Sequence, residues 1–317
     1  MLRIEGLRKQ FGDVRALDGV SFDVTPGQVF GFLGSNGAGK TTTMRIILGF
    51  LQADAGTVTW NGRPSRAWPR RTWGYMPEER GLYQRMPVLE QLVFYASLYG
   101  VPRREARDGA LEWLARFRIP EYADRKAESL SKGNQQKVQY IATILHGPDV
   151  LIMDEPFSGL DPVNAAQLRE ALLEMRDQGR TIVFSTHQLA TAEALCDSVA
   201  IIDRGRVVIS GPTRDVRRST GHQVVRIATA GDGDAAWLRE LPGAAVTRRG
   251  ADFSELRLEA GADPQAILRA ALEGGREVLQ FEVADPSLEE VFVERVGTLD
   301  VEETSLAAPQ PVTGDAR

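Results

Sequence analysis

The stretch Val29-Phe-Gly-Phe-Leu-Gly34-Ser-Asn-Gly-Ala-Gly-Lys40-Thr41 decides the fold of this 317-residue chain. It opens with a continuous apolar run, which predicts a buried strand, and the helical pattern Thr41 to Leu51 follows its glycines. The order of strand, loop and helix fits the phosphate-binding pattern G-x-x-x-x-G-K-[ST]. Its glycines permit backbone angles that turn successive amides toward phosphate oxygens, and the positive end of the following helix faces the same anion. The stretch therefore predicts an α/β fold with a nucleotide phosphate site.

Two side chains at the end of this loop carry its chemistry. Lys40 supplies a positive charge for the β and γ phosphates, and the Thr41 hydroxyl can ligate Mg²⁺. The residues of the loop that we assign to nucleotide binding are Gly34, Ser35, Asn36, Gly37, Ala38, Gly39, Lys40, Thr41 and Thr42. The alternative is a glycine-rich turn with a surface lysine, which the agreement of strand, loop and helix disfavours.

A second apolar run, Val150-Leu-Ile-Met, ends in two carboxylates, Asp154 and Glu155. A buried strand with this ending delivers both acids to the carboxyl edge of the sheet, where ligands of α/β proteins bind. Neighbouring side chains point to opposite faces of a strand, so the two acids have different tasks. We expect Asp154 to serve Mg²⁺ and Glu155 to act as the general base for water. A solvated strand end is an equal alternative for this run alone, but the glycine loop disfavours it.

The remaining patterns of the first 215 residues predict an α/β sandwich with a helical insertion. Alternating runs predict antiparallel strands at Leu2–Leu7, Val20–Val24 and Thr57–Trp60. Continuous runs predict further central strands at Thr181–Ser185 and Val199–Ile202. Helical patterns between them cover Asn164–Gln178 and Leu189–Leu195. The insertion at residues 87–145 has three predicted helices, at Val88–Tyr99, Arg104–Phe117 and Asn134–Leu145.

A different pattern follows the polar, glycine-bearing stretch Gly211–Gly221. The predicted elements alternate as strand, helix, strand, strand, helix, strand, at His222–Thr229, Ala235–Leu241, Ala244–Arg249, Phe253–Glu259, Pro264–Leu272 and Glu277–Val283. This order suits a small ferredoxin-like module over residues 222–297, closed by a helix at Ser287–Val296. The tail, residues 299–317, has no periodicity and is predicted to be disordered.

Composition disfavours several other classes of protein. The net charge of -5 comes from 38 basic and 43 acidic residues that are interspersed, so no basic field favours nucleic acid as a partner. No segment approaches the ~18 uninterrupted apolar residues of a membrane-spanning helix, and the N-terminus lacks a signal-peptide layout. We therefore expect a cytoplasmic chain that reaches a membrane only through a partner. The single Cys196 suits a reducing compartment and is predicted to be a small buried hydrophobe.

The stretch Leu130-Ser-Lys-Gly-Asn-Gln-Gln136 resembles the signature of the ATP-binding cassette (ABC) family, usually Leu-Ser-Gly-Gly-Gln. Phe11 matches the aromatic residue that stacks on adenine in this family, Asp161 in Ser158-Gly-Leu-Asp161 matches the D-loop, and His187 matches the switch histidine. Alone, Phe11 would be a core aromatic, His187 a loop histidine and Ser131 of the signature a helix cap. The resemblance covers residues 1–215 and implies an ATPase with a RecA-like core, an antiparallel β subdomain and a helical subdomain.

The same resemblance implies two partners. In this family two cassettes pair head to tail, so Ser131, Gly133 and Asn134 should act on the γ-phosphate held by a second, identical or different, cassette. The wording Gly74-Tyr-Met-Pro-Glu-Glu-Arg-Gly-Leu-Tyr83 and Asp285-Pro-Ser-Leu-Glu-Glu-Val-Phe292 resembles bacterial ATPases of sodium extrusion and drug export. These work with a separate multi-span permease, which implies ATP-driven export and a place on the inner face of the cell membrane.

Three positions depart from the family pattern. Lys132 and Asn134 replace the usual glycine and glutamine of the signature, and Glu78 stands where the Q-loop glutamine is expected. We expect Glu78 to face the metal, with a solvated loop acid as the alternative. A rival function is a soluble ABC protein of ribosomes or DNA, which commonly has two cassettes or a long coiled coil, and this chain shows neither. The C-terminal module could sense a ligand, dimerise or simply pack.

Overall fold

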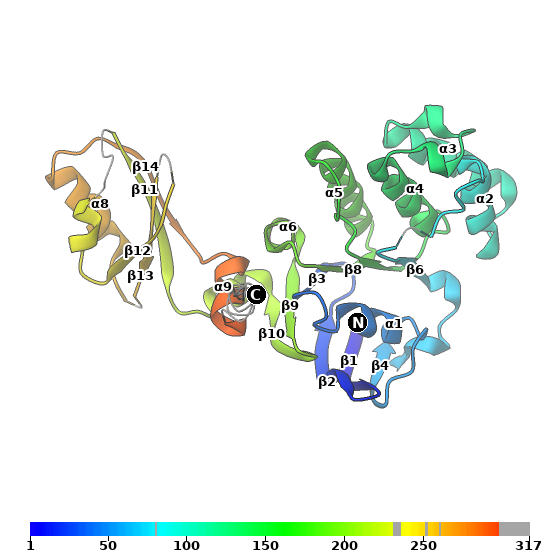
Figure 1. Ribbon diagram of the computed structural model, residues 1–317, viewed down its shortest axis with the longest axis horizontal. Helices are drawn as coiled ribbons and strands as arrows, with labels where there is room; N and C mark the ends of the chain where they lie inside the picture. The colour runs from blue at the N-terminus through cyan, green and yellow to red at the C-terminus, as the bar shows by residue number, and fades with distance from the viewer. Residues whose placement is uncertain (80, 231–235, 251–252, 260, 298–317) are drawn as a thin grey trace, which may run out of the picture. The chain divides into compact units, whose positions relative to one another are not determined.

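The computed structural model describes residues 1–79, 81–230, 236–250, 253–259 and 261–297 (Figure 1). The chain divides into two compact units, Met1–Thr213 and a second that begins at Arg214. The first unit contains the glycine loop, both acids and the signature stretch.

A six-stranded sheet forms the centre of the first unit, with the strand order β10-β9-β3-β8-β7-β6. All neighbours pair in parallel except β10, which runs antiparallel to β9. The strands are β3 (Val29–Leu33), β6 (Trp73–Met76), β7 (Val150–Asp154), β8 (Thr181–Thr186), β9 (Ser198–Asp203) and β10 (Arg206–Pro212). Every residue of β3, β7 and β8 is buried, which confirms the prediction of central strands from the continuous apolar runs. Parallel pairing brings the carboxyl ends of β3, β7 and β8 to one edge.

A second, antiparallel sheet has the strand order β2-β1-β4-β5. Its strands are β1 (Leu2–Phe11), β2 (Val14–Val24), β4 (Ala55–Trp60) and β5 (Arg63–Pro64). Helix α1 (Lys40–Ile47) lies between the two sheets (Figure 1), and one apolar core joins Met44 and Ile47 of the helix to strands of both. The helix ends earlier than predicted, because Gly49 adopts a positive φ of 70° two residues after its end.

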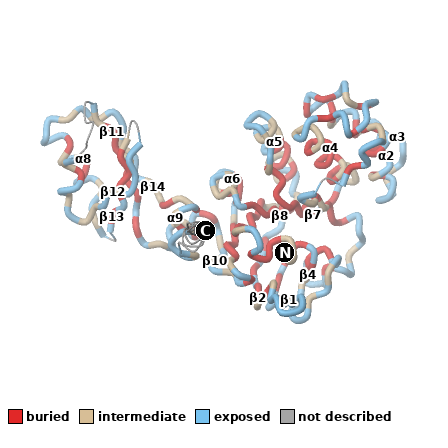
Figure 2. The backbone as a smooth tube through the Cα atoms, in the orientation of Figure 1, coloured by how far each residue is buried: buried red, intermediate tan, exposed pale blue. Residues whose placement is uncertain are grey.

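The helical insertion contains α2 (Val88–Leu98), α3 (Arg103–Arg116) and α4 (Lys132–Ile144). Helix α4 begins two residues before the predicted Asn134, because the Ser131 side chain accepts a hydrogen bond from the amide of Asn134 and caps the helix there. Helices α5 (Pro162–Asp177) and α6 (Leu189–Leu195) accompany the central sheet. Short 3-10 turns lie at Ser65–Ala67, Arg70–Thr72, Pro120–Tyr122 and Ala127–Ser129. Figure 2 shows that the buried residues of this unit concentrate along the sheet and on the inner sides of these helices.

Two strands of the central sheet were not predicted. Strand β6 has only four residues and contains a glycine, so no apolar run marks it, yet it pairs in parallel with β7. Strand β10 alternates between exposed and half-buried residues because it is an edge strand, and its last two residues lie in the polar stretch Gly211–Gly221. It leads into α7 (Thr213–Arg218).

The second unit holds a four-stranded antiparallel sheet with the order β12-β13-β11-β14. Its elements are β11 (Gln223–Thr229), β12 (Ala244–Arg249), β13 (Ser254–Leu258), α8 (Pro264–Glu273), β14 (Val278–Ala284) and α9 (Leu288–Val296). This order, with a helical segment after the first and third strands, is the predicted ferredoxin-like arrangement. Its apolar core unites residues such as Val225, Leu256 and Ile267.

One predicted helix of this module is wrong in type. The region Ala235–Leu241 contains a 3-10 helix at Ala236–Glu240, and Ala235 lies outside the described residues. Pro242 and Gly243 follow at once, which leaves too few residues for an α-helix. The tail predicted to be disordered, residues 299–317, also lies outside the described residues.

The two ends of the module meet at α7. Arg217 donates hydrogen bonds to the carbonyl oxygens of Pro286 (2.7 Å) and Asp285 (2.8 Å), and Arg218 pairs with the Asp285 carboxylate at 3.0 Å. Ser287 then begins α9 with a capping box that it forms with Glu290. The chain therefore leaves α7, builds the four-stranded sheet and returns to α7.

Candidate functional site

A cavity of about 250 Å³ lies at the edge of the central sheet where β3, β7 and β8 end. It brings together the glycine loop, both acids and the Q-loop position. Its lining residues are Ala16, Ser35, Asn36, Gly37, Gly39, Lys40, Thr41, Thr42, Glu78, Asp154 and Glu155. The loop, the two acids and Glu78 are distant in the sequence and meet here as predicted, although Gly34 and Ala38 of the loop do not line the cavity.

Close packing explains two of the loop glycines. A Cβ on Gly34 would come within 2.4 Å of the carbonyl oxygen of Ile202 on β9, and one on Gly39 within 2.8 Å of the carbonyl oxygen of Ala16. Gly39 also has a φ of 108°, which a residue with a side chain rarely adopts. The loop therefore keeps its path only with glycine at both positions, and this path places the N-terminus of α1 against the cavity.

Lys40 is buried at the base of the loop. Its Nζ donates hydrogen bonds to the carbonyl oxygens of Gly34 (2.7 Å) and Ser35 (3.1 Å) and lies 3.6 Å from Oε1 of Glu155. Phosphate oxygens are stronger partners for an ammonium group than neutral carbonyls. The amine is thus held at the place where phosphate would enter, by contacts that an anion can replace.

Asp154 is the most buried polar side chain of the cavity, and both of its oxygens have partners. Oδ2 accepts a hydrogen bond from the Thr41 hydroxyl at 2.7 Å, and Oδ1 accepts one from the Ser185 hydroxyl. The described residues include no cluster of three or more His, Cys, Asp or Glu side chains that could hold a metal. Magnesium keeps several waters and phosphate oxygens and needs only one or two protein ligands, so Thr41 and Asp154 form a donor set that fits it.

Glu155 has an unusual backbone conformation, with a φ of +49°, directly after β7. Its amide contacts both the carbonyl oxygen of Ser185 (3.2 Å) and the Ser185 hydroxyl (3.1 Å). Oε1 accepts a hydrogen bond from Nδ1 of His187 at 2.9 Å, whereas the buried Oε2 has no hydrogen-bond partner among the described residues. A buried carboxylate oxygen without a partner beside a phosphate site can accept a proton from water.

The Q-loop segment between β6 and α2 is held by α4. Nε2 of Gln139 donates hydrogen bonds to the carbonyl oxygens of Pro77 (2.8 Å) and Glu79 (3.2 Å), which flank Glu78. The Glu78 side chain is exposed and lines the cavity with Asp154 and Glu155. The structure thus places Glu78 at the nucleotide cavity, and its role toward a metal stays a prediction.

The other predicted residues lie outside this cavity. Phe11, at the end of β1, is 48% exposed, with the Lys9 amine 5.4 Å from its ring centroid. Ser131 caps α4, and Asp161 caps α5, where hydrogen bonds from backbone amides, that of Asn164 first, lower the pKa of its carboxyl.

The signature and D-loop residues are neighbours of one another. A Cβ on Gly133 would lie 2.8 Å from the Asn164 side chain at the start of α5. Ser131 and Asp161 are exposed, and Gly133 and Asn134 are half-buried. The helix starts of α4 and α5 therefore form one open surface, and none of the four predicted residues touches the cavity of its own chain.

Sequence reasoning missed Ser185 and Gln139. Ser185 follows the apolar run of β8 and pairs with Asp154 in the parallel register, and only that register links them. Gln139 lies on the buried side of a predicted helix. A glutamine at a buried helical position was the signal that could have identified it.

Comparison with known proteins places both units in families. Residues 17–158 match the ABC transporter family, and residues 211–296 match the C-terminal domain of ATP-binding proteins similar to DrrA1-3. An uncharacterized ABC transporter ATP-binding protein of Bacillus subtilis is 43% identical over 299 residues, which cover 94% of this chain and 99% of that protein.

Other relatives have names that state a role. The linearmycin resistance ATP-binding protein of Bacillus subtilis is 30% identical and covers 94% of this chain and 98% of its own length. A Nod factor export ATP-binding protein of Ralstonia nicotianae is 36% identical and covers 94% of each chain. A solved ATP-binding subunit of an ABC transporter has a TM-score of 0.65 at 35% identity, and the match covers 70% of this chain and 93% of that one.

Proposed function

The chain belongs to the ABC transporter family as an ATP-binding subunit, and from that premise we propose that it is the motor of an exporter whose membrane-spanning part is a separate permease. An ATPase of this family binds nucleotide and couples hydrolysis to transport. The observation that carries the proposal for the site is the free Oε2 of Glu155 beside Lys40 and Asp154 in one cavity.

The residues of the cavity divide the work of hydrolysis. The loop amides and Lys40 bind the phosphates, and Lys40 exchanges its two carbonyl partners for phosphate oxygens. Thr41 and Asp154 would hold Mg²⁺, which neutralises charge on the phosphates when it is bound. Glu155 accepts the proton of the attacking water through Oε2, while His187 holds Oε1 and fixes the orientation of the carboxylate.

A second cassette completes the site in this proposal. The surface that carries Ser131, Gly133, Asn134 and Asp161 lies away from the cavity of its own chain, so it serves a nucleotide held by a partner cassette. The N-terminus of α4 and its capping serine suit a phosphate, because free amides and the helix dipole attract anions. Phe11 remains exposed to stack on the adenine ring.

The permease docks, in our proposal, on an aromatic surface of the helical insertion. None of the helices in the described parts of the chain has the length and apolar character that a membrane crossing requires. Tyr83 and Phe94 are 53% and 39% exposed, and the Tyr83 ring stacks on that of Tyr95 with centroids 5.8 Å apart. Exposed aromatic clusters of this kind mark protein interfaces.

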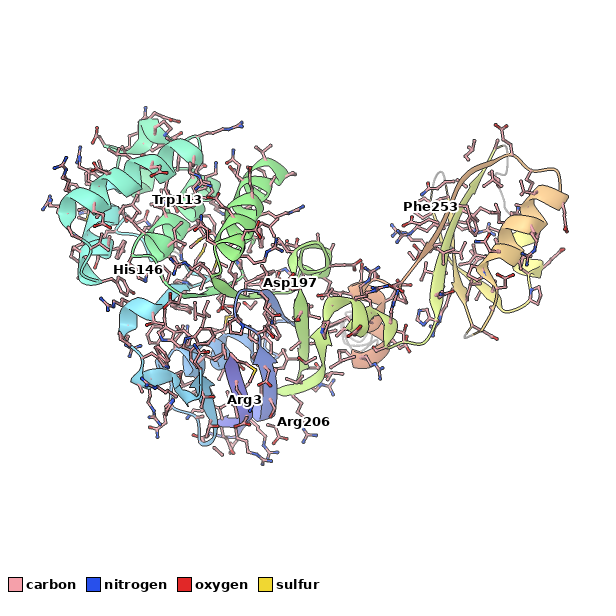
Figure 3. All side chains as sticks on the ribbon, turned by 180° about the vertical axis from the view of Figure 1, so that it is seen from behind. Arg3, Trp113, His146, Asp197, Arg206 and Phe253 are labelled. Atoms are coloured by element: carbon pink, nitrogen blue, oxygen red, sulfur yellow. The ribbon has the colours of Figure 1, made fainter. Side chains whose placement is uncertain are left out.

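This surface adjoins the nucleotide cavity through the Q-loop segment. A second cavity, of about 210 Å³, is lined by Pro77, Gly81 and Tyr95, and by His146, which stacks on Tyr99 at 3.9 Å (Figure 3 labels His146). Pro77 and Gly81 thus line the second cavity, whereas Glu78 lines the nucleotide cavity. A movement of the segment upon ATP binding would reach the permease directly. The export roles in the relatives' names favour an outward direction of transport.

The turnover of a single variant tests the proposal. Glu155→Gln should lower the ATPase rate by about 100-fold or more while ATP binding is retained, because only the general base is lost. Glu170→Gln is the matched control, since Glu170 is an exposed acid on α5 outside the cavity. Wild-type turnover in the Glu155→Gln protein would overturn the assignment of the base.

A further inference from the structure

Ser185 is a fully buried hydroxyl that joins the two acids of the site. It lies on β8 directly opposite Asp154 of β7 in the parallel register, and its exposed fraction is 0%. The hydroxyl donates its hydrogen to Oδ1 of Asp154 and accepts a hydrogen bond from the amide of Glu155 at 3.1 Å. One oxygen atom therefore contacts the carboxylate of one acid and the backbone of the next.

These two contacts control two different orientations. With Oδ1 held by Ser185, Oδ2 of Asp154 is the oxygen left to face Thr41, 2.7 Å away, and the cavity. The backbone of Glu155 has a φ of +49°, a conformation that costs free energy for a residue with a side chain and persists only when its surroundings hold it. The Glu155 amide is held by both the hydroxyl and the carbonyl oxygen of Ser185.

We propose that Ser185 is a positioning residue for ATP hydrolysis: its hydroxyl turns one oxygen of Asp154 toward the metal site and holds the Glu155 backbone so that its carboxylate faces Lys40 and His187. The inference rests on the proposed function, since it assumes that Asp154 and Glu155 act in hydrolysis. Ser185 itself touches neither nucleotide nor water in this role.

The alternative is that Ser185 only fills space in the core. The two roles differ in what the residue must provide, because packing needs volume whereas positioning needs a strong hydrogen-bond donor. Cysteine still fills the site, with a sulfur somewhat larger than the serine oxygen, but it is a weak hydrogen-bond donor, and alanine neither fills the site nor donates. Ser185→Cys therefore separates the two roles, and Ser185→Ala reports their sum.

The test measures three quantities on the full chain: turnover, the Mg²⁺ concentration at half-maximal rate, and ATP affinity in EDTA. Both Ser185→Ala and Ser185→Cys should lower turnover or apparent Mg²⁺ affinity by about 10- to 100-fold, the usual range for residues that orient metal ligands. ATP affinity in EDTA should stay within about twofold, since the loop and Lys40 are unchanged.

Thr181→Ala is the matched control. Thr181 is a buried hydroxyl on the same strand, and it accepts a hydrogen bond from the amide of Gly27 away from the cavity. This variant should lose comparable thermal stability but keep wild-type Mg²⁺ dependence. Its melting temperature is the reference for any general loss of structure in the Ser185 variants.

Two results would overturn the inference. A Ser185→Cys protein with wild-type turnover and Mg²⁺ dependence would show that the residue only fills space. Equal losses in Thr181→Ala would show a general effect of buried hydroxyls on β8. Wild-type turnover in the Glu155→Gln protein would contradict the proposed function itself. If Glu155→Gln loses turnover as expected but the Ser185 variants keep wild-type turnover and Mg²⁺ dependence, only the inference about Ser185 is contradicted.

Discussion

Removal of the Glu78 side chain should weaken the apparent affinity for Mg²⁺ in hydrolysis. The side chain lines the nucleotide cavity with Asp154 and Glu155, but it is exposed, so solvent screens its charge. We therefore expect an effect close to the limit for bulk water. A carboxylate about 6 Å from a divalent cation, one water molecule away, contributes about 1.4 kcal/mol at a dielectric constant of about 80.

This free energy corresponds to about a tenfold change in apparent Mg²⁺ affinity. Glu78→Ala should raise the Mg²⁺ concentration at half-maximal rate by about tenfold and lower permease-stimulated turnover, with a smaller change in ATP affinity. Glu78→Gln should keep turnover within about tenfold of wild type, because the amide oxygen can still bind a water of the cation.

The assay is a titration of Mg²⁺ against ATPase rate, with and without permease. Glu79→Ala is the matched control: Glu79 is the adjacent exposed acid, and its side chain does not line the cavity. If Glu78→Ala matches wild type in both series, Glu78 is a solvated loop acid and the reasoning is refuted. Equal effects of the two alanine variants would attribute the change to loop charge in general.

The remaining predictions concern the loop, the cysteine and the domain boundary. Lys40→Ala should abolish most ATP binding in a fluorescence titration, because it removes the only cation that lines the cavity among the described residues. Glu155→Gln should bind ATP and elute as a dimer in size-exclusion chromatography with Mg-ATP. A monomeric Glu155→Gln protein would contradict the proposed second cassette. Burial raises the pKa of the Cys196 thiol, so a thiol reagent at pH 8 should modify it only after unfolding, and rapid labelling of the folded chain would contradict its burial. A chain truncated after Gly221 should still fold and bind ATP, since the cavity lies wholly within Met1–Thr213, and a soluble truncation without ATP binding would show that the boundary is wrong.

The sequence predicted those parts of the first unit that carry strong local patterns. The apolar runs at Val29 and Val150 marked central strands because both faces of these strands are buried. The loop between Gly34 and Thr41 was recognisable because its glycines are required by packing and backbone angle at fixed spacing. Strands β6 and β10 escaped because one is four residues long and the other is a half-exposed edge.

The missed site residues depend on tertiary register. Ser185 meets Asp154 only because β7 and β8 pair in parallel with these residues opposite one another, and no local pattern states that pairing. Gln139 holds the Q-loop from a helix more than sixty residues away along the chain. In our proposal, Phe11 and Ser131 act only on a bound nucleotide or across a second cassette, so the structure of a single subunit does not bring them into the cavity.

The return of the chain to α7 has a consequence for protein engineering. Since Arg217 and Arg218 bind the backbone and side chain around Asp285, the entry and exit of the four-stranded module lie side by side. A module with adjacent ends can be deleted or exchanged as one unit, because a linker of a few residues can join the chain on its two sides without a long loop. Replacement of residues 222–284 by such a linker, or by the corresponding module of a relative, keeps α7, the capping box and α9 intact. Chimeras joined at these two points would measure what the module contributes to the rest of the chain.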